Sequence, residues 1–167
     1  GLALGCDSIA HQTALEKGAR TIAILPSTLD SILPKENVEL AEKIVEAGGL
    51  LISEYYEAPK SRNDMVSRFV VRDRLQALFS DAVLLSASYA PNNLGNDCGS
   101  RHAMEKAKSY GIKRCVIYND SKHHDIAMYD LNRQILEKDS SVIRIDSANM
   151  SEAVLRLVTK TNQRFLF

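Results

Sequence analysis

The sequence predicts an α/β fold of the doubly wound type, in which helices cover both faces of a mostly parallel sheet. Two observations support this prediction. Short apolar runs alternate along the chain with longer amphipathic segments, and four of these runs are apolar almost throughout. Such runs are typical of parallel strands that are buried on both faces. The length of 167 residues suits one domain with a single core, so we expect 1–167 to form one Rossmann-like domain.

Each element follows from its local pattern. Strands are predicted at 21–25 (TIAIL), 50–53 (LLIS), 82–85 (AVLL), 115–118 (CVIY) and 142–145 (VIRI). Helices are predicted near 7–17, 38–47, 66–78, 101–110, 126–137 and 151–161. Asp7 and Asn37 stand where they can cap the first two helices.

The composition narrows the class of protein. The formal net charge is zero, which argues against a protein that coats nucleic acid along its whole surface. No apolar run approaches the roughly 20 residues that span a bilayer, so we expect no membrane partner. Three cysteines suggest neither a disulfide framework nor a zinc site, and we expect a cytoplasmic protein. The chain begins inside a Gly-rich turn, which leads us to expect further residues upstream of Gly1.

The opening turn GLALGCDSIAH is the segment that most clearly indicates a ligand site. Gly1 and Gly5 allow close approach of a ligand to the backbone of residues 1–5, which include Leu2 and Ala3. The helix that follows directs N–H groups and the positive end of its dipole at this turn, and phosphate is the natural ligand. The alternative is a tight loop without a ligand.

A basic segment follows at 60–74, where five Lys and Arg residues stand against two Asp residues. Arg68 and Arg72 are four residues apart and share a helix face, and Arg74 lies close by. Arginine suits planar, bidentate contacts with phosphate. Phe69 is either a core residue or a platform on which a base stacks. Glu54 is more suited to orienting an arginine than to acting as a base.

A second anion site is predicted at Gly99 and Ser100, where a helix begins after the segment NDCGS. Its alternative is an ordinary helix capped by Ser100. The stretches 1–5, 54–65 and 86–100 all belong at the carboxyl ends of strands, so we predict that they converge on one rim of the sheet. His123 and His124 have no third ligand at a matching spacing, so we expect no metal. His11 is expected to be packed or hydrogen-bonded internally.

Five segments, taken in order, resemble the DNA-processing protein A family (DprA/Smf). They are GLALGCDSIAHQTAL, TIAILPSTLD, LPKENVELAEKI, GGLLISE and RFVVRDRLQALFSDAVLL, and together they cover roughly residues 1–118. The family carries a Gly-Leu-Ala-x-Gly-x-Asp-x-x-Ala-His turn, a Leu-Leu-Ser-Glu strand and a Phe-x-x-Arg-Asn-Arg helix. This chain departs from the last motif, because Asp73 stands at the position of the Asn.

The resemblance implies a Rossmann-like core that binds single-stranded DNA in a basic pocket. It also implies loading of a RecA-type recombinase during natural transformation, homodimers, and no covalent chemistry or cofactor. The DNA-binding residues carried over by position are Gly1, Leu2, Ala3, Gly5, Arg68, Arg72, Arg74, Gly99 and Ser100.

Two alternatives remain at this stage. One is a sensor or enzyme for a nucleotide-derived small ligand, since related Rossmann-like domains bind such molecules in the same cleft. The enzyme version is disfavoured because the Pro-Gly-Gly-x-Gly-Thr loop of the related phosphoribohydrolases is missing from this sequence. The other is an interaction module that has kept the fold and lost the pocket.

Overall fold

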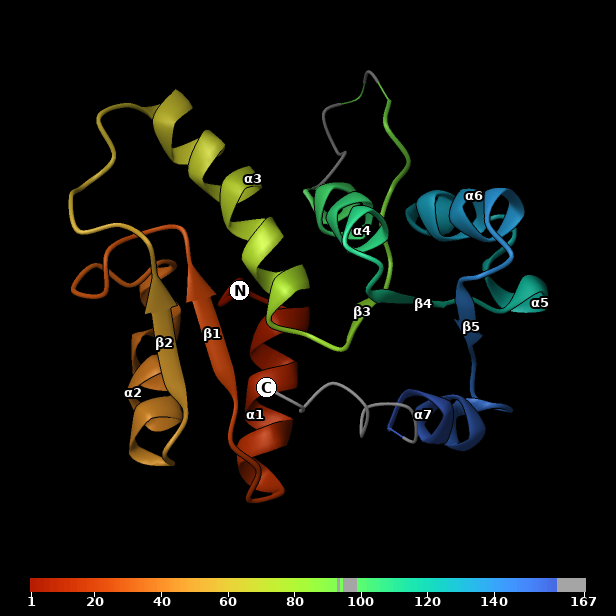
Figure 1. The fold of residues 1–167 in the computed structure, drawn as a ribbon, viewed down its shortest axis with the longest axis horizontal. Helices are drawn as coiled ribbons and strands as arrows, with labels where there is room; N and C mark the ends of the chain where they lie inside the picture. Colours follow the sequence, from red (N-terminus) through yellow and green to blue (C-terminus); the bar gives the residue numbers. More distant parts are fainter. Residues whose placement is uncertain (93, 95–98, 159–167) are drawn as a thin grey trace. The chain divides into compact units, whose positions relative to one another are not determined.

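The computed structural model describes residues 1–92, 94 and 99–158. The chain divides into two compact units, residues Gly1–Leu75 and Gln76–Phe167, and each has its own sheet (Figure 1). The prediction that 1–167 form one domain is not tested by this division and stays a prediction. None of the helices among the described residues is long and apolar enough to cross a membrane.

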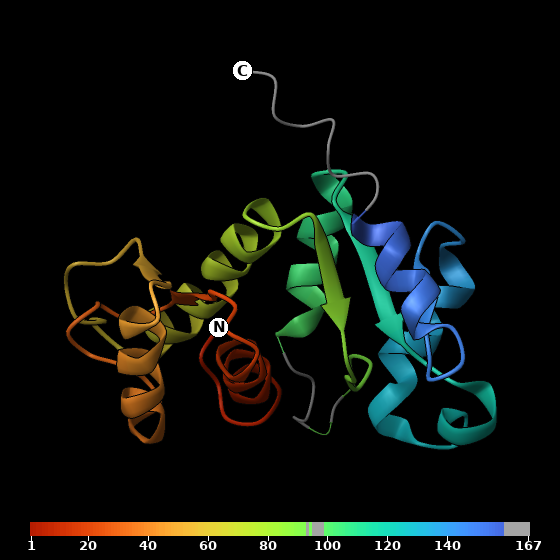
Figure 2. The ribbon, with the colours of Figure 1, turned by 90° about the horizontal axis from the view of Figure 1, so that it is seen from below.

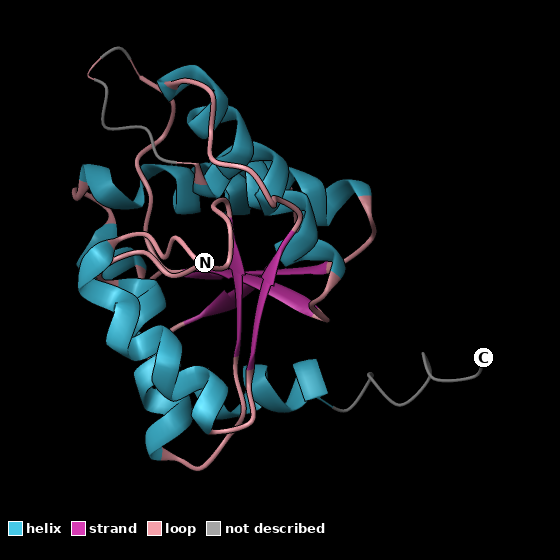
Figure 3. Cartoon of the chain, turned by 90° about the vertical axis from the view of Figure 1, so that its left-hand side faces the viewer, coloured by secondary structure: helices cyan, strands magenta, loops and turns pink. Residues whose placement is uncertain are grey.

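The first unit builds a two-stranded parallel sheet. Strands β1 (Ile22–Leu25) and β2 (Leu50–Ser53) run side by side, with Ile22 opposite Leu50 (Figure 1; Figure 3). Helices α1 (Cys6–Glu16) and α2 (Val38–Glu46) pack on one face, where the core consists of Leu2, Ala23, Leu25, Leu40, Ala41 and Ile44. A 3-10 turn, η1 (Lys35–Asn37), leads into α2, and α3 (Arg62–Leu78) follows β2.

The second unit builds a three-stranded parallel sheet in the order β3-β4-β5. The strands are β3 (Ala82–Leu85), β4 (Lys113–Ile117) and β5 (Ile143–Ile145). The helical segments are α4 (Ser100–Ser109), α5 (Asp120–His123), η2 (Ala127–Tyr129), α6 (Asp130–Lys138) and α7 (Met150–Val158).

Successive residues of β4 point to opposite faces of this sheet, as a strand requires. Val116 packs in a cluster with Met104 of α4 and Leu131 of α6. Its neighbour Cys115 packs with Ala153 of α7. Helices therefore cover both faces of the sheet in the second unit, as predicted (Figure 2).

All five predicted strands are present, and their ends agree with the prediction within two residues. Helix α3 begins at Arg62, four residues before the predicted start. The reason is a capping arrangement that the prediction overlooked: the Asp64 N–H donates to Ser61 Oγ at 3.1 Å, and the Lys60 N–H donates to Asp64 Oδ2 at 2.9 Å.

Two further helices differ from the prediction. The segment predicted as one helix at 126–137 divides into η2 and α6, because Ile126 has an extended backbone and a 3-10 turn follows it. The helix predicted at 151–161 is present as α7 up to Val158, and residues 159–161 lie outside the described residues.

The predicted side-chain caps at the first two helices are wrong. Asn37 makes no capping bond, because its Nδ2 donates instead to Leu2 O and Ser8 Oγ, each at 2.8 Å. Asp7 lies within α1, and its Oδ2 accepts the Ala3 N–H at 3.1 Å. Both side chains stabilise the opening turn rather than a helix end.

Asp139 joins α6 to the rest of the second unit through several donors. The Ser141 hydroxyl, the Arg114 guanidinium, the Ser141 N–H and the Lys108 ammonium all hold the pKa of Asp139 well below its usual range. Because the folded state lowers this pKa, the carboxylate stabilises the fold above its unfolded pKa of about 3.9 and loses this contribution as pH falls.

We expect Asp139→Asn to lower the urea midpoint of unfolding at pH 7 and to lower it less at pH 3, where the carboxyl is largely protonated in the unfolded chain but still ionised in the fold. The matched control is Asp125→Asn, because the Asp125 side chain is 97% exposed and should matter little at either pH. Equal losses at both pH values for Asp139→Asn would contradict this role of the charge.

Candidate nucleic-acid interface

The opening turn is held by buried polar side chains. His11 Nε2 lies 2.7 Å from Gly1 O, and a carbonyl oxygen only accepts, so Nε2 carries the proton. In the neutral ring Nδ1 then accepts the Thr21 hydroxyl, also at 2.7 Å. Ser8 Oγ donates to Ala3 O at 2.8 Å. The prediction that His11 is bonded internally is confirmed, and the turn has a fixed shape.

The four predicted residues of this turn have different surroundings. The Leu2 side chain is only 2% exposed and belongs to the core, so this residue can offer a ligand its backbone alone. Ala3 is exposed, and its N–H is already bonded to Asp7. Gly5 has φ +85°, a conformation that glycine adopts without strain, and the first turn of α1 follows it.

Arg72 brings helix α3 against this turn and against the end of β1. Its Nη1 donates to Ile24 O at 2.8 Å. A Cβ atom at Gly1 would lie 2.7 Å from the same Nη1, so a larger residue here would shift the tip of the Arg72 side chain. Arg72 therefore joins three parts of the first unit: the Gly-rich turn, the carboxyl end of β1 and the basic helix.

The last two arginines of the predicted basic segment, Arg72 and Arg74, also lie against carboxylates. Arg72 Nε lies 3.3 Å from Asp73 Oδ1, and the Arg72 side chain is 12% exposed. Arg74 pairs with Glu54, the residue that follows β2, and both side chains are about one third exposed. The interpretation of Glu54 as a residue that orients an arginine is confirmed. Arg74 is the most accessible of the three predicted arginines.

Arg68 is 7% exposed and is bonded to the loop at 54–61. Its Nη1 donates to Glu57 O at 2.8 Å, and its Nη2 donates to Ala58 O at 3.3 Å and to Asp64 Oδ2 at 3.1 Å. The guanidinium carbon lies 4.2 Å from the centroid of the Tyr55 ring. These contacts fix the loop that follows β2, and a phosphate contact of Arg68 stays a prediction.

Two aromatic rings in this unit reach solvent. Phe69 is 42% exposed, and the Arg72 guanidinium carbon lies 5.8 Å from its ring centroid, so it is not a fully buried core residue. Tyr56 is 90% exposed in the loop after β2. Tyr56 was not predicted from the sequence as a candidate stacking residue. Two consecutive tyrosines just after a predicted strand could have indicated it.

Gly99 and Ser100 belong to the second unit. Gly99 is the residue before α4, Ser100 is the first residue of α4, and the helix start has no side-chain cap among the residues that the structure describes. The alternative of a helix capped by Ser100 is therefore wrong, because Ser100 stands inside the helix. Residues 96–98 of this motif lie outside the described residues. The predicted convergence of 1–5 and 54–65 with 86–100 involves both units and stays a prediction.

Neighbouring histidines in the second unit have no metal-binding arrangement. His123 stacks on Tyr129 with a centroid distance of 3.8 Å, and its Nδ1 accepts the Asn119 N–H at 3.1 Å. The described part of the chain contains no group of three His, Cys, Asp or Glu side chains placed to hold a metal ion.

Two solved structures share this fold. DNA processing protein A from Streptococcus pneumoniae matches 93% of this chain and 49% of its own, with a TM-score of 0.69 and 25% identity. DNA processing protein A from Helicobacter pylori, whose structure concerns its binding of single-stranded DNA, matches 93% of this chain and 64% of its own. Its TM-score is 0.68 and its identity is 28%.

Curated relatives agree in sequence. Protein Smf of Borreliella burgdorferi is 36% identical over 95 residues, which are 57% of this chain and 29% of that protein. Protein Smf of Synechocystis is 39% identical over 105 residues, which are 63% of this chain and 25% of that protein. This chain therefore spans less than a third of the length of either relative.

The model of the family described as DNA recombination-mediator protein A matches residues 1–143, which is most of the chain. The match extends from the Gly-rich turn through both sheets to the beginning of β5. The resemblance inferred from five ordered motifs is thereby confirmed, as is the Rossmann-like α/β fold class. The chain belongs to the DNA recombination-mediator protein A (DprA/Smf) family.

Proposed function

We propose that this chain binds single-stranded DNA through the first unit, at the edge where β1 and β2 end. The observation that carries this proposal is the meeting of Arg72 with the Gly-rich turn at the end of β1. Parallel α/β sheets bind ligands at the carboxyl ends of their strands, and a glycine turn before a helix suits a phosphate. The single-stranded DNA bound by the Helicobacter pylori relative supports the same ligand here.

The phosphate contacts are assigned to the turn at 1–5 and to Arg72 and Arg74. Arg74 is the more accessible, and its partner Glu54 is itself partly exposed, so a phosphate can compete for its guanidinium. Tyr56 and Phe69 expose rings on which bases can stack without regard to sequence. Gly99 and Ser100 are proposed as a second phosphate contact.

A wider cellular role is proposed from the family to which the chain belongs. We propose that the DNA-bound protein loads a RecA-type recombinase in the cytoplasm during natural transformation, as a homodimer and without covalent chemistry. Membership of the DNA recombination-mediator family supports this role.

A salt titration of oligo-dT binding, followed by fluorescence anisotropy, tests the phosphate contacts. Arg74→Ala should weaken binding and lower the slope of log affinity against log salt by about 0.7, the value for one contact on a single strand. Glu54→Gln should strengthen binding, because it removes the carboxylate that competes with phosphate for Arg74.

The matched control is the exposed pair of Arg156 and Glu152 on α7. Arg156→Ala and Glu152→Gln should leave both affinity and slope unchanged. Tyr56→Ala should lower affinity with an unchanged slope, because stacking involves no counterion release. An unchanged slope for both Arg72→Ala and Arg74→Ala, each shown to be folded, would contradict the proposed interface.

A further inference from the structure

Two buried side chains of the first unit hold successive carbonyl groups of the opening turn. Asn37 Nδ2 donates to Leu2 O and to Ser8 Oγ, each at 2.8 Å. The Ser8 hydroxyl accepts this bond and donates its own proton to Ala3 O, also at 2.8 Å. Asn37 is 5% exposed and Ser8 is 8% exposed. A buried pair of side chains therefore fixes two successive peptide groups of the turn.

The direction of these carbonyls decides the direction of the N–H groups that follow them. The peptide bonds of the turn are trans, and in a trans peptide the N–H points opposite to the C=O of the same peptide group. Because Leu2 O and Ala3 O face buried donors, the N–H groups of Ala3 and Leu4 face the other way. Both Ala3 and Leu4 are exposed, so an anion can reach this side of the turn.

The Ala3 N–H already binds an anionic group on this side. It donates to Asp7 Oδ2 at 3.1 Å, and the Asp7 side chain is 37% exposed. The Arg72 guanidinium lies close by, because a Cβ atom at Gly1 would meet both Asp7 Oδ2 and Arg72 Nη1. Within the described part of the chain, the Leu4 N–H has no hydrogen-bond partner. The turn thus presents one N–H that binds a carboxylate and a second that is open to a further anion.

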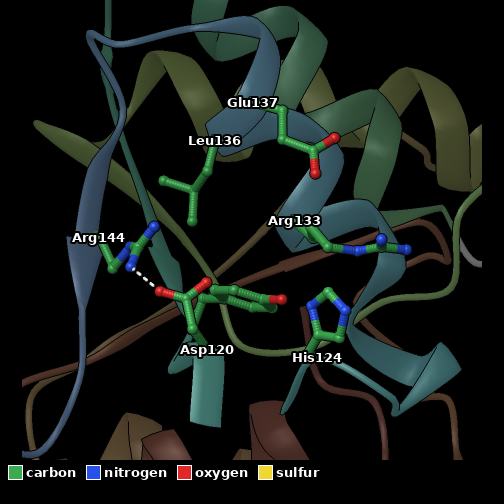
Figure 4. A pocket seen from close by; sticks show the side chains of 7 residues that line it. Asp120, His124, Arg133, Leu136, Glu137 and Arg144 are labelled. Carbon is green, nitrogen blue, oxygen red and sulfur yellow. Dashed lines mark hydrogen bonds and ion pairs between the residues drawn. The ribbon is translucent and has the colours of Figure 1, made fainter.

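A pocket of about 240 Å³ at the end of β4, in the second unit, differs from this turn (Figure 4). Two guanidinium groups, of Arg133 and Arg144, and two carboxylates, of Asp120 and Glu137, line it. Figure 4 shows the Arg144 guanidinium directed at the Asp120 carboxylate, to which its Nη1 donates. Because charges of both signs are equal in number here, we expect no preference for an anion, and the pocket serves below as a control site.

We propose that Ser8 and Asn37 are positioning residues for the DNA ligand. By holding the Leu2 and Ala3 carbonyls inward, they keep negative partial charges away from a phosphate and direct the Leu4 N–H at one of its oxygens. Backbone N–H groups of a turn that face one side form an anion site, and helix α1 adds the positive end of its dipole. Both side chains act through the backbone of the turn. This inference rests on the proposed function, which assigns a phosphate to the turn.

NMR of the ¹⁵N-labelled chain tests the direction of the Leu4 N–H. We expect inorganic phosphate, and in a separate titration oligo-dT, to move the Leu4 amide proton downfield, because an N–H that donates to a phosphate oxygen is deshielded. The amide protons of Asp120 and Arg144, at the control pocket, should stay in place with phosphate. Ser8→Ala removes the donor to Ala3 O and should abolish most of the Leu4 shift.

The affinity for oligo-dT gives a second readout. Ser8→Ala should weaken binding about fivefold, the effect of one hydrogen bond, with an unchanged salt slope because no cationic group is lost. Asn37→Asp keeps the shape of the side chain but loses the donor of two bonds, so it should weaken binding at least as much. The matched control is Ser109→Ala, because Ser109 Oγ also donates to a carbonyl, Lys106 O at 2.9 Å, at the end of α4.

The inference is overturned if neither probe moves the Leu4 amide proton, a result that depends on no variant. It is also overturned if folded Ser8→Ala and Asn37→Asp keep both the Leu4 shift and the affinity of the unmodified chain. Oligo-dT binding without a Leu4 shift would refute the inference and leave the proposed function standing. A Leu4 shift with phosphate that Ser8→Ala loses, in a chain that does not bind oligo-dT, would refute the proposed function and support the positioning roles toward a free phosphate.

Discussion

Asn132→Leu should destabilise the second unit by roughly 3–5 kcal/mol, because several buried backbone groups lose their partner at once. Asn132 is fully buried. Its Nδ2 donates to Ser86 O at 3.0 Å and to Ile117 O at 2.9 Å, and its Oδ1 accepts the Ser88 N–H at 3.2 Å. One side chain therefore joins the ends of β3 and β4 to helix α6.

Urea unfolding followed by circular dichroism measures this effect as a lower midpoint with an unchanged slope. The matched control is Asn63→Leu, the same substitution at an exposed position of α3, which should change stability by less than about 0.5 kcal/mol. Equal midpoints for Asn132→Leu and Asn63→Leu would show that the Asn132 bonds do not hold the strand ends together.

Arg68→Ala should destabilise the first unit by roughly 2–4 kcal/mol, because three hydrogen bonds of a charged group are lost. The Glu57 and Ala58 carbonyls and the Asp64 carboxylate lose their donor, and Tyr55 loses the cation above its ring. We expect the loop at 54–61 to become more accessible, so limited proteolysis should cleave it faster in the variant.

Arg62→Ala is the control for Arg68→Ala, since Arg62 is exposed on the same helix. The oligo-dT salt titration separates the two roles of Arg68. Unchanged stability together with a slope lower by about 0.7 would show that Arg68 contacts phosphate rather than holding the loop. Lower stability with an unchanged slope would assign it to the loop.

The sequence by itself determined the fold class and the family of this protein. Parallel strands buried on both faces need continuous apolar runs, and the five predicted segments, four of them such runs, are the strands of the structure. The motifs from the Gly-rich turn to the basic helix are local in sequence, so their order identified the family without any tertiary contact.

Helix ends were predicted less well where side chains bond to distant groups. The pattern at Asn37 predicts a cap, and the structure uses its amide to hold Leu2 O, 35 residues earlier in the chain. A local pattern carries no information on such a partner. The cap at the start of α3 was local, in the pair Ser61 and Asp64, and could have been recognised from the sequence.

The roles of the basic residues were decided by tertiary structure alone. Arg68 and Arg72 share a helix face in sequence, yet Arg68 faces the carbonyls of the 54–61 loop and Arg72 faces the Ile24 carbonyl and Gly1. The burial of a charged side chain and the choice of its partner depend on which segments lie next to each other in the fold. The spacing of residues along the chain does not predict these tertiary contacts.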